Sequence, residues 1–470
     1  MAKHFTFEVM ISVNCIDVLK SGSPLYQNFS WDIEDGDNWV ITGNNGSGKT
    51  TLLEVLAGKT HVTKGEIEYD FITGGNWDER YAEKSRKITY IPAHALQTFT
   101  RDTHDMYYQQ RYYDIGDEQT IRVRDVLGEN IHHLHELDIP SSLSIDHLID
   151  LDVKRLSNGQ LKKVLLLRNF LKGMPRLLLM DYPFEGLDHQ SREDLCAFID
   201  FISQRYLVQV ILVDHHHHLP SVINKKLTLE KFNIVKSESF QPVQNNPENG
   251  ETIAMYSNTN IVSDVVAMRN LQLRYGTHQL FKNFNWTVKQ GERWALVGRN
   301  GSGKTTLFSM IFADHPQAYA QEVYLFGKRR GTGESIWDIK RRISYLGPEQ
   351  ISYFNADVSS SGKEYIRTLN RKLDEKSLET AIDYFSAHDM MDKQVRFLSS
   401  GELQLLLIIH CFLSEKELLL LDEPFQFLDD DRKNRFVNYL HTHMTPETTL
   451  ILITHYEEDM KHWTHRKMVL

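Results

Sequence analysis

Residues 35–58 read DGDNWVITGNNGSGKTTLLEVLAG, and residues 290–313 read QGERWALVGRNGSGKTTLFSMIFA. The two stretches lie 290 − 35 = 255 residues apart. In each, a short apolar segment leads into a glycine-rich turn, and a helix is expected to begin near the lysine. A buried strand that runs through a glycine turn into a helix is typical of α/β folds, so the pattern predicts a sheet with helices packed on it.

Three further motifs recur in the same order. RLSNGQLKKVLLL (155–167) returns as FLSSGELQLLLII (397–409), RLLLMDYPFEGLD (176–188) as ELLLLDEPFQFLD (417–429), and VILVDHHHH (210–218) as LILITHYEE (450–458). Because the order is unchanged, the chain is interpreted as one domain and its duplicate.

The domain boundaries follow from composition. We predict a first domain over residues 1–235, a linker over 236–264 and a second domain over 265–470. The linker is rich in Asn, Ser and Pro and has no periodicity. Its first few residues leave a second interpretation open, an edge strand of the first domain.

Apolar runs predict the strands of each domain. Segments 177–180 and 418–421 are fully apolar, as central parallel strands are, and 211–213 and 450–453 predict further buried strands. The charged segments 93–153 and 349–395 are interpreted as helical subdomains. Each domain is thus expected to have a mixed sheet core and a helical subdomain.

The composition excludes disordered and fibrous proteins. The chain has 470 residues, of which 41% are hydrophobic and 25% charged, so it is globular and long enough for two to four domains. Its net charge of −10 argues against nucleic acid as the main partner. Three distant cysteines (Cys15, Cys196 and Cys411) predict no disulfide framework and a reducing compartment.

The sequence also contains no secretory signal core and no run of roughly 18 apolar residues that could span a bilayer. We therefore expect a cytoplasmic protein. If it acts at a membrane, it lies on the inner face of the cell membrane and separate subunits cross the bilayer.

Both glycine turns match the phosphate-binding pattern GxxxxGK[ST]. In such a loop, backbone N–H groups surround the β-phosphate, the Lys reaches the β/γ oxygens, and the Thr hydroxyl faces Mg²⁺. The residues predicted to bind nucleotide are Gly43, Asn44, Asn45, Gly46, Ser47, Gly48, Lys49, Thr50 and Thr51, with Gly298, Arg299, Asn300, Gly301, Ser302, Gly303, Lys304, Thr305 and Thr306 in the second copy.

An aspartate ends each central apolar strand. Asp181 lies 132 residues after the first loop lysine, and Asp422 lies 118 residues after the second. A carboxylate at this strand end can reach the water shell of Mg²⁺. We predict that Mg²⁺ is held through phosphates and water near Thr50 and Asp181, and near Thr305 and Asp422.

Together these motifs resemble those of the ATP-binding-cassette (ABC) ATPases, over essentially the whole chain. LSNGQ (156–160) and LSSGE (398–402) resemble the LSGGQ signature of that family. The resemblance implies two P-loop NTPase domains packed head to tail as an intramolecular dimer, hence a monomeric ATPase that uses ATP and Mg²⁺. It further implies that each ATP lies between the phosphate loop of one domain and the signature of the other.

The resemblance assigns residues to two sites. Site two would combine the second phosphate loop with Ser157 and Gly159, and site one the first loop with Ser399 and Gly401. The histidines His215 and His455 would contact the γ-phosphate, and Tyr275 would stack on adenine. We interpret His215 in this way, rather than the run of four histidines (215–218) as a metal site.

The two sites are not equivalent. In the family, the residue after the strand-end Asp orients the attacking water, and here it is Glu423 in the second domain but Tyr182 in the first. A phenol with a pKa near 10 is a poor base at pH 7. Glu423, His455 and Lys304 are therefore the predicted catalytic residues, and site one is predicted to be degenerate. The alternative, that Glu185 replaces the missing carboxylate, stays open. A second difference concerns adenine stacking, because the position in the first domain that corresponds to Tyr275 is occupied by Lys20.

A narrower resemblance concerns the second domain. DHPQAY (314–319) and LFGKRRGTGESIWDIKRRISYL (325–346) look like the tandem ABC ATPases of the ModF type, which are associated with molybdate transport or photorepair. The loop KRRGTGES is equally well interpreted as a solvated surface loop.

Three biological roles fit this sequence. The first is the ATP-binding component of a transport system with separate transmembrane subunits, of molybdate type by resemblance. The second is a soluble ABC ATPase of translation or repair type, and the third is a regulatory module clamped by ATP. The family's Gln that senses the transmembrane partner is replaced by Ala93 and Pro348, which weighs against the first role. The complete set of hydrolytic residues around Glu423 weighs against the third role, because a regulatory module would not need it.

Overall fold

The computed structural model describes residues 9–20, 23–93, 121–153, 156, 158–215, 218–242, 263–275, 278–347, 359–370, 373–426, 428–443, 445–454 and 466–470. These residues form two compact units. Unit 1 holds the described residues up to 242, and unit 2 holds those from 263 onward.

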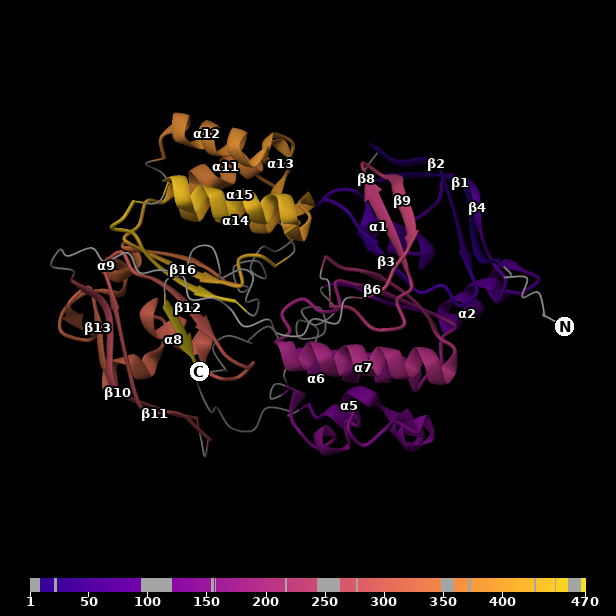
Figure 1. Cartoon of the computed structure of the whole chain (residues 1–470), viewed down its shortest axis with the longest axis horizontal. Helices are drawn as coiled ribbons and strands as arrows, with labels where there is room; N and C mark the ends of the chain where they lie inside the picture. Colours follow the sequence, from indigo (N-terminus) through magenta and orange to yellow (C-terminus); the bar gives the residue numbers. More distant parts are fainter. Residues whose placement is uncertain are drawn as a thin grey trace. The chain divides into compact units, whose positions relative to one another are not determined.

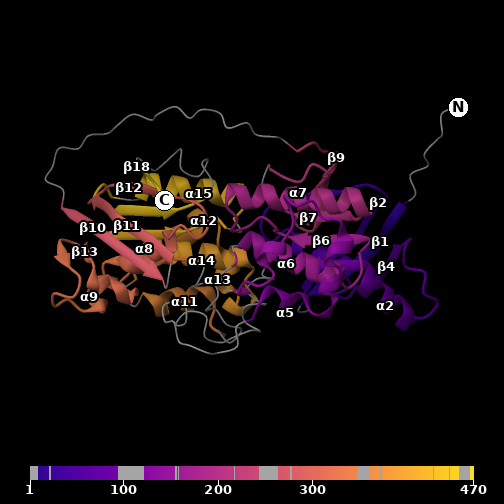
Figure 2. The same ribbon diagram turned by 90° about the horizontal axis from the view of Figure 1, so that it is seen from below.

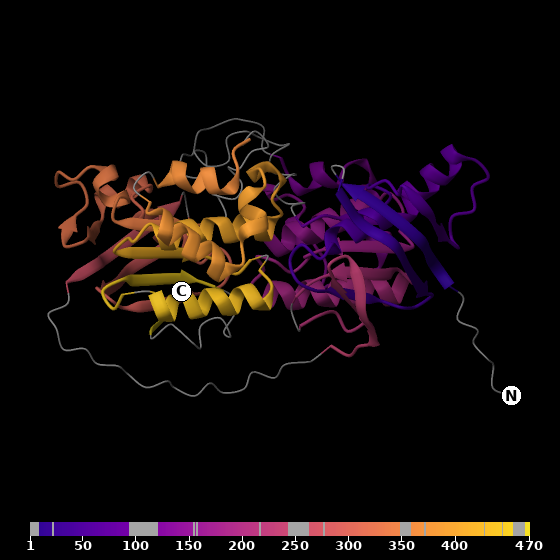
Figure 3. The same ribbon diagram turned by 90° about the horizontal axis from the view of Figure 1, so that it is seen from above.

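Unit 1 is built on a six-stranded sheet of order β5-β6-β7-β3-β8-β9. Its strands are β3 (Trp39–Thr42), β5 (Ile88–Ile91), β6 (Leu177–Asp181), β7 (Gln209–Val213), β8 (Lys225–Glu230) and β9 (Asn233–Ser239). All neighbours are parallel except β8 and β9. A second, antiparallel sheet holds β1 (Val9–Lys20), β2 (Ser23–Glu34) and β4 (Lys64–Tyr69), whose long indigo strands β1 and β2 run side by side (Figure 3).

The helices of unit 1 flank the central sheet. They are α1 (Lys49–Leu56), α2 (Trp77–Lys87), α5 (Val123–Leu127), α6 (Asn158–Phe170) and α7 (His189–Tyr206), with 3-10 helices η1 (Glu129–Leu137) and η2 (Asp146–Leu148). The helices α6 and α7 pack against each other, and α5 packs on α6 (Figure 2).

Unit 2 has the same arrangement of a central sheet and a second, antiparallel sheet. Its five-stranded parallel sheet has the order β15-β16-β17-β12-β18, formed by β12 (Arg293–Val297), β15 (Ile343–Leu346), β16 (Leu418–Asp422), β17 (Thr449–Ile453) and β18 (Arg466–Val469). An antiparallel sheet holds β10 (Asp264–Tyr275), β11 (His278–Lys289), β13 (Glu322–Leu325) and β14 (Lys328–Arg329).

The helices of unit 2 are α8 (Lys304–Ile311), α9 (Ile336–Lys340), α11 (Gly362–Leu369), α12 (Glu375–Phe385), α13 (His388–Asp392), α14 (Ser400–Leu413) and α15 (Asp430–His443), with 3-10 helices η4 (Pro316–Ala320) and η5 (Val395–Phe397). The helix α12 packs against both α14 and α15 (Figure 1). In the part of the chain that the structure describes, no helix is long and apolar enough to cross a membrane.

Each central strand is apolar on both faces because each unit has two hydrophobic cores, one on either side of its sheet. In β16, Leu419 and Leu421 join the core that contains α12 and α14, whereas Leu418 and Leu420 join the core that contains α8. The strand β6 alternates in the same way. The continuous apolar runs in the sequence therefore reflect burial on both faces.

The predicted fold class is confirmed, and the structure adds detail. The strand β9 continues to Ser239, within the segment predicted as linker, so the edge-strand interpretation holds for its first residues. In the segment predicted as a helical subdomain of unit 1, the described residues 121–153 form one short α-helix and two 3-10 helices. Most of the predicted linker lies outside the described residues.

Candidate functional site

The two phosphate loops adopt the same backbone conformation. Gly43, Gly46 and Gly48 have φ values of 137°, 80° and 101°, and Gly298, Gly301 and Gly303 have 156°, 83° and 100°. These left-handed values favour glycine. Gly48 and Gly303 are the N-caps of α1 and α8, so each loop ends at a helix N-terminus that attracts anions.

The first glycine of each loop also lies against the backbone of a distant segment, β8 for Gly43 and the residue after β18 for Gly298. A Cβ atom on Gly43 would stand 2.1 Å from the Leu229 carbonyl oxygen, and one on Gly298 would stand 2.8 Å from that of Leu470. The lysine of each loop donates hydrogen bonds to the first two carbonyl oxygens of the same loop. The Lys49 Nζ donates to the carbonyl oxygens of Gly43 (2.7 Å) and Asn44 (2.9 Å), and the Lys304 Nζ donates in the same manner to those of Gly298 and Arg299.

A threonine and an aspartate meet beside each loop. The Thr50 hydroxyl donates to Asp181 Oδ2 at 2.9 Å, and the Thr305 hydroxyl donates to Asp422 Oδ2 at 3.2 Å. Both aspartates are buried at the carboxyl end of a central strand. Burial raises the pKa of Asp181 to about 7, against hydrogen bonding from Thr50 and the charge of Lys49, which lower it. A nearby cation would favour its charged form.

The donor set fits a magnesium-bound nucleotide. Among the described residues, Asp181 Oδ1 is buried without a hydrogen-bond partner, and the hydroxyls of Ser47 and Ser302 are buried without one in the two phosphate loops. Hydroxyl and carboxylate oxygens are the ligands that Mg²⁺ prefers, and buried polar atoms are normally satisfied. Both loops could therefore accept phosphate, and the Thr and Asp oxygens beside each loop would help to hold a magnesium ion and its water shell.

Tyr182 and Glu423 occupy equivalent positions. Each follows its strand-end aspartate with a left-handed backbone, φ 46° for Tyr182 and 51° for Glu423. The Tyr182 N–H donates to the Val213 carbonyl oxygen, and the Glu423 N–H donates to that of Ile453. Each residue is 8% exposed. The phenol of one unit thus takes the place of the carboxylate of the other.

His215 lies directly beside Tyr182. Its Nε2 and the Tyr182 hydroxyl are 2.9 Å apart, and the two ring centroids are 5.2 Å apart. His215 follows β7, the neighbour of the strand that ends at Asp181. The structure therefore brings together Lys49, Thr50, Asp181, Tyr182 and His215 by direct contacts or adjacent strand ends. The corresponding His455 lies outside the described residues.

The described residues of the signature segments lie at the start of helices α6 and α14. Ser399 caps α14, where its hydroxyl accepts a hydrogen bond from the Glu402 N–H and the Glu402 carboxylate accepts one from the Ser399 N–H. Gly401 lies in the first turn of α14 and Gly159 in the first turn of α6. A Cβ atom on Gly159 would stand 2.8 Å from the Cβ of Ser191. Ser157 lies outside the described residues.

A contact missed by sequence reasoning joins each signature helix to the segment after the strand-end aspartate. In α14 the Gln404 side-chain amide donates to the Pro424 carbonyl oxygen at 2.9 Å and to that of Glu423 at 3.4 Å. In α6 the Lys162 ammonium donates to the carbonyl oxygens of Pro183 and Glu185. Burial lowers the pKa of Lys162 to about 8. Lys162 and Gln404 occupy the same position in the repeated motif, and this correspondence could have pointed to a shared contact.

Tyr275 ends β10, where it faces His278 across the hairpin, and Lys20 faces Ser23 at the same place in unit 1. The predicted correspondence of Tyr275 and Lys20 therefore agrees with strand register. Tyr26 is a buried strand residue whose hydroxyl donates to the Gly48 carbonyl oxygen at 3.0 Å.

Two histidines of unit 2, the buried His315 and the partly buried His410, predict acid sensitivity. Burial lowers the pKa of His315 and of His410 to about 4, from 6.5. Between pH 6.5 and 4 the unfolded chain binds protons that these folded side chains do not, so stability that is present above pH 6.5 is lost as the pH falls toward 4. We expect the thermal midpoint of wild type to fall more steeply over that window than that of a variant with both His315→Gln and His410→Gln. Equal slopes would contradict this assignment.

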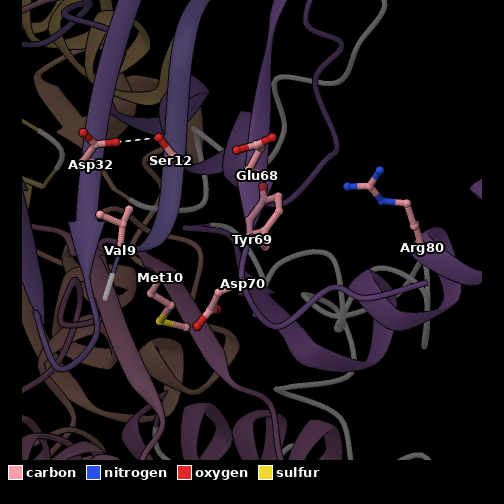
Figure 4. A pocket seen from close by; sticks show the side chains of 8 residues that line it. All are labelled: Val9, Met10, Ser12, Asp32, Glu68, Tyr69, Asp70 and Arg80. Carbon is pink, nitrogen blue, oxygen red and sulfur yellow. Dashed lines mark hydrogen bonds between the residues drawn. The ribbon is translucent and has the colours of Figure 1, made fainter. Parts of the chain in front are cut away.

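Two cavities lie away from the phosphate loops, both in unit 1. One, of about 440 Å³, is lined by Val9, Met10, Ser12, Asp32, Glu68, Tyr69, Asp70 and Arg80 (Figure 4). The other, of about 400 Å³, lies beside α7. Neither contains a predicted nucleotide-binding residue.

Comparison with known proteins agrees with the geometry of these sites. The family described as "ABC transporter" matches residues 26–185 and 281–426, which include both phosphate loops and both strand-end aspartates. The ABC transporter ATP-binding protein ModF of Escherichia coli is 30% identical over 463 residues, covering 90% of this chain and 89% of that protein. An uncharacterized ABC transporter ATP-binding protein of Schizosaccharomyces pombe is 28% identical and covers 94% of both chains.

Solved structures show the same fold. The archaeal ribosome recycling factor aABCE1, in complex with a ribosomal stalk protein, matches 97% of this chain with a TM-score of 0.59 at 18% identity. A protein described as RNase-L Inhibitor matches 96% with a TM-score of 0.57 at 20% identity. The family match in both halves, together with the relative in Escherichia coli, shows that this chain belongs to the ABC transporter family and is a tandem ATP-binding ABC ATPase.

Proposed function

We propose that this ATPase hydrolyses ATP at the phosphate loop of unit 2 and retains ATP at the phosphate loop of unit 1. The observation that carries the proposal is the exchange of Glu423 for Tyr182 at equivalent backbone positions. Phosphoryl transfer to water depends on positioning, on neutralising phosphate charge and on a group that orients the water. Unit 1 has the first two and lacks a carboxylate in the third position.

In the competent site, named site two, Lys304 holds the β/γ oxygens and the Glu423 carboxylate accepts a hydrogen bond from the attacking water. Mg²⁺, when bound near Thr305 and Asp422, neutralises phosphate charge. By the family's pattern, His455 contacts the γ-phosphate and the signature residues Ser157 and Gly159 complete the site.

In site one, to which the family's pattern would add the signature residues Ser399 and Gly401, the Tyr182 phenol stands where the base would be. The Tyr182 hydroxyl lies 2.9 Å from His215 Nε2, within hydrogen-bonding distance. The alternative base Glu185 is three residues further along, and its carboxylate lies near the Lys162 ammonium, whose pKa it raises. This favours a structural role for Glu185.

For the biological role, we propose the ATP-binding component of an ABC transport system. The relative ModF, whose name describes an ABC transporter ATP-binding protein, supports this role. A second role, a soluble ABC ATPase acting on a cytosolic partner, is favoured by Ala93 and Pro348 in place of the glutamine that senses a transmembrane partner in the family.

One experiment separates the two roles. The affinity-tagged full-length chain carrying Glu423→Gln, which is expected to stay ATP-bound, is isolated with Mg-ATP from membrane and soluble fractions, and wild type with ADP serves as control. An integral membrane protein that co-purifies in stoichiometric amount only with ATP supports the transport role. A stoichiometric soluble partner in the absence of any membrane protein would overturn it in favour of the second role.

A further inference from the structure

His315 joins the side chain of Tyr275 to the helix that starts at the phosphate loop of unit 2. It is 1% exposed and lies between α8 and η4. On the tyrosine side, its Nε2 is 2.7 Å from the Tyr275 hydroxyl. On the helix side, its backbone N–H donates to the carbonyl oxygen of Ser309 in α8 at 3.1 Å. A short chain of contacts thus runs from the phosphate loop to Tyr275.

The protonation of His315 follows from its neighbours. The Gln317 backbone N–H donates to Nδ1 at 3.2 Å, which fixes Nδ1 as an acceptor. The neutral ring then carries its proton on Nε2 and donates to the Tyr275 oxygen. Burial lowers the pKa of His315 to about 4, so the ring stays neutral at neutral pH. The hydrogen bond to Tyr275 therefore has one defined direction.

We propose that His315 is a positioning residue that sets the spacing between the Tyr275 ring and the phosphate loop of unit 2. This inference rests on the proposed function and on the family's pattern, by which Tyr275 would stack on the adenine of the ATP that unit 2 hydrolyses. A nucleotide has a fixed length between its base and its β-phosphate, so a ring held at the matching distance binds it without an ordering cost. Unit 1 has Lys20 at the equivalent register position, which cannot form this platform.

Steady-state hydrolysis of ATP by the full chain tests the inference. Tyr275→Phe keeps the ring and removes only the hydroxyl, and His315→Ala removes the donor. Since a net hydrogen bond is worth about 0.5–1.5 kcal/mol, each change is expected to raise the KM for ATP about three- to tenfold and to leave kcat within about twofold. The double variant should show no more than the larger single effect, because both changes break one interaction.

Two controls make the result specific. His315→Gln places an amide donor near the position of Nε2 and should restore the KM to within about twofold of wild type. His410→Gln changes another histidine of unit 2, in the last turn of α14, and should leave the KM unchanged. Multiplicative effects in the double variant, or an unchanged KM in Tyr275→Phe, would overturn the inference.

Tyr275→Ala distinguishes a failure of the positioning role of His315 from a failure of the adenine-stacking role of Tyr275. If Tyr275→Ala raises the KM strongly while Tyr275→Phe and His315→Ala leave it unchanged, Tyr275 stacks on the base and His315 does not position it. If Tyr275→Ala leaves the KM unchanged, the adenine-stacking role itself is wrong, and the inference falls with it.

Discussion

Glu423→Gln is expected to lower the rate of ATP hydrolysis by roughly 10²–10⁴, which is the scale of losing a general base. The glutamine has the same shape as the glutamate, so the buried position after β16 stays filled, but an amide cannot accept a proton from water. ATP binding should survive because the phosphate loop is unchanged. Turnover is measured by phosphate release at saturating Mg-ATP, and binding by equilibrium titration with labelled ATP.

Tyr182→Phe is the matched control, since it changes the equivalent position of unit 1 and removes only a hydroxyl. It should keep more than about a third of wild-type turnover, because a phenol supplies no base at pH 7. If Glu423→Gln itself keeps more than a third of wild-type turnover, Glu423 is not the group that orients the water.

Lys304→Ala and Lys49→Ala are expected to differ strongly, although the two lysines make the same contacts with their loops. Lys304→Ala removes the charge that holds the β/γ-phosphates at the hydrolysing site, and turnover should fall by at least ~10². Lys49→Ala weakens ATP at a site that hydrolyses little. We expect a loss of about tenfold, equivalent to roughly 1.4 kcal/mol, through weaker domain closure.

The measurement is kcat for both variants at several concentrations of Mg-ATP, so that weakened binding is separated from slowed hydrolysis. A symmetric enzyme would suffer equally from both changes. If Lys49→Ala is the less active of the two, or if both are equally inactive, unit 1 takes part directly in hydrolysis and the interpretation of Tyr182 is wrong.

Short-range patterns predicted the scaffold of each site well. The segments 177–180, 211–213 and 418–421 were expected as strands, and the structure places β6, β7 and β16 there. These strands are buried on both faces, and therefore nearly every residue carries the signal. The expected helix starts at Lys49 and Lys304 are likewise confirmed.

Edges and single-turn elements were harder to predict. The strand β9 was assigned to the linker from Lys236 onward because an edge strand with exposed residues has the composition of a loop. The segment 129–137, which ends in HHLHEL, forms a 3-10 helix. It lies between Gly128 and Asp138, which both have a positive φ. Its apolar spacing alone does not distinguish the 3-10 from the α form.

Contacts between distant side chains were outside the reach of sequence patterns. Tyr182 and His215 are 33 residues apart and meet only because β6 and β7 are neighbours in the sheet. Tyr275 and His315 are 40 residues apart and meet across the hairpin strand and the end of α8. The sequence identified Tyr182, His215 and Tyr275 by their places in the motifs, but neither the pairings nor the role of His315.

The identity of the bound nucleotide tests the central claim most directly. The wild-type chain is saturated with labelled ATP and Mg²⁺, free nucleotide is removed on a rapid desalting column, and the bound nucleotide is quantified. We predict one retained ATP per chain beside at most one ADP, with Lys49→Ala losing the retained ATP and Glu423→Gln retaining two. Two ADP and no ATP per wild-type chain would contradict the account.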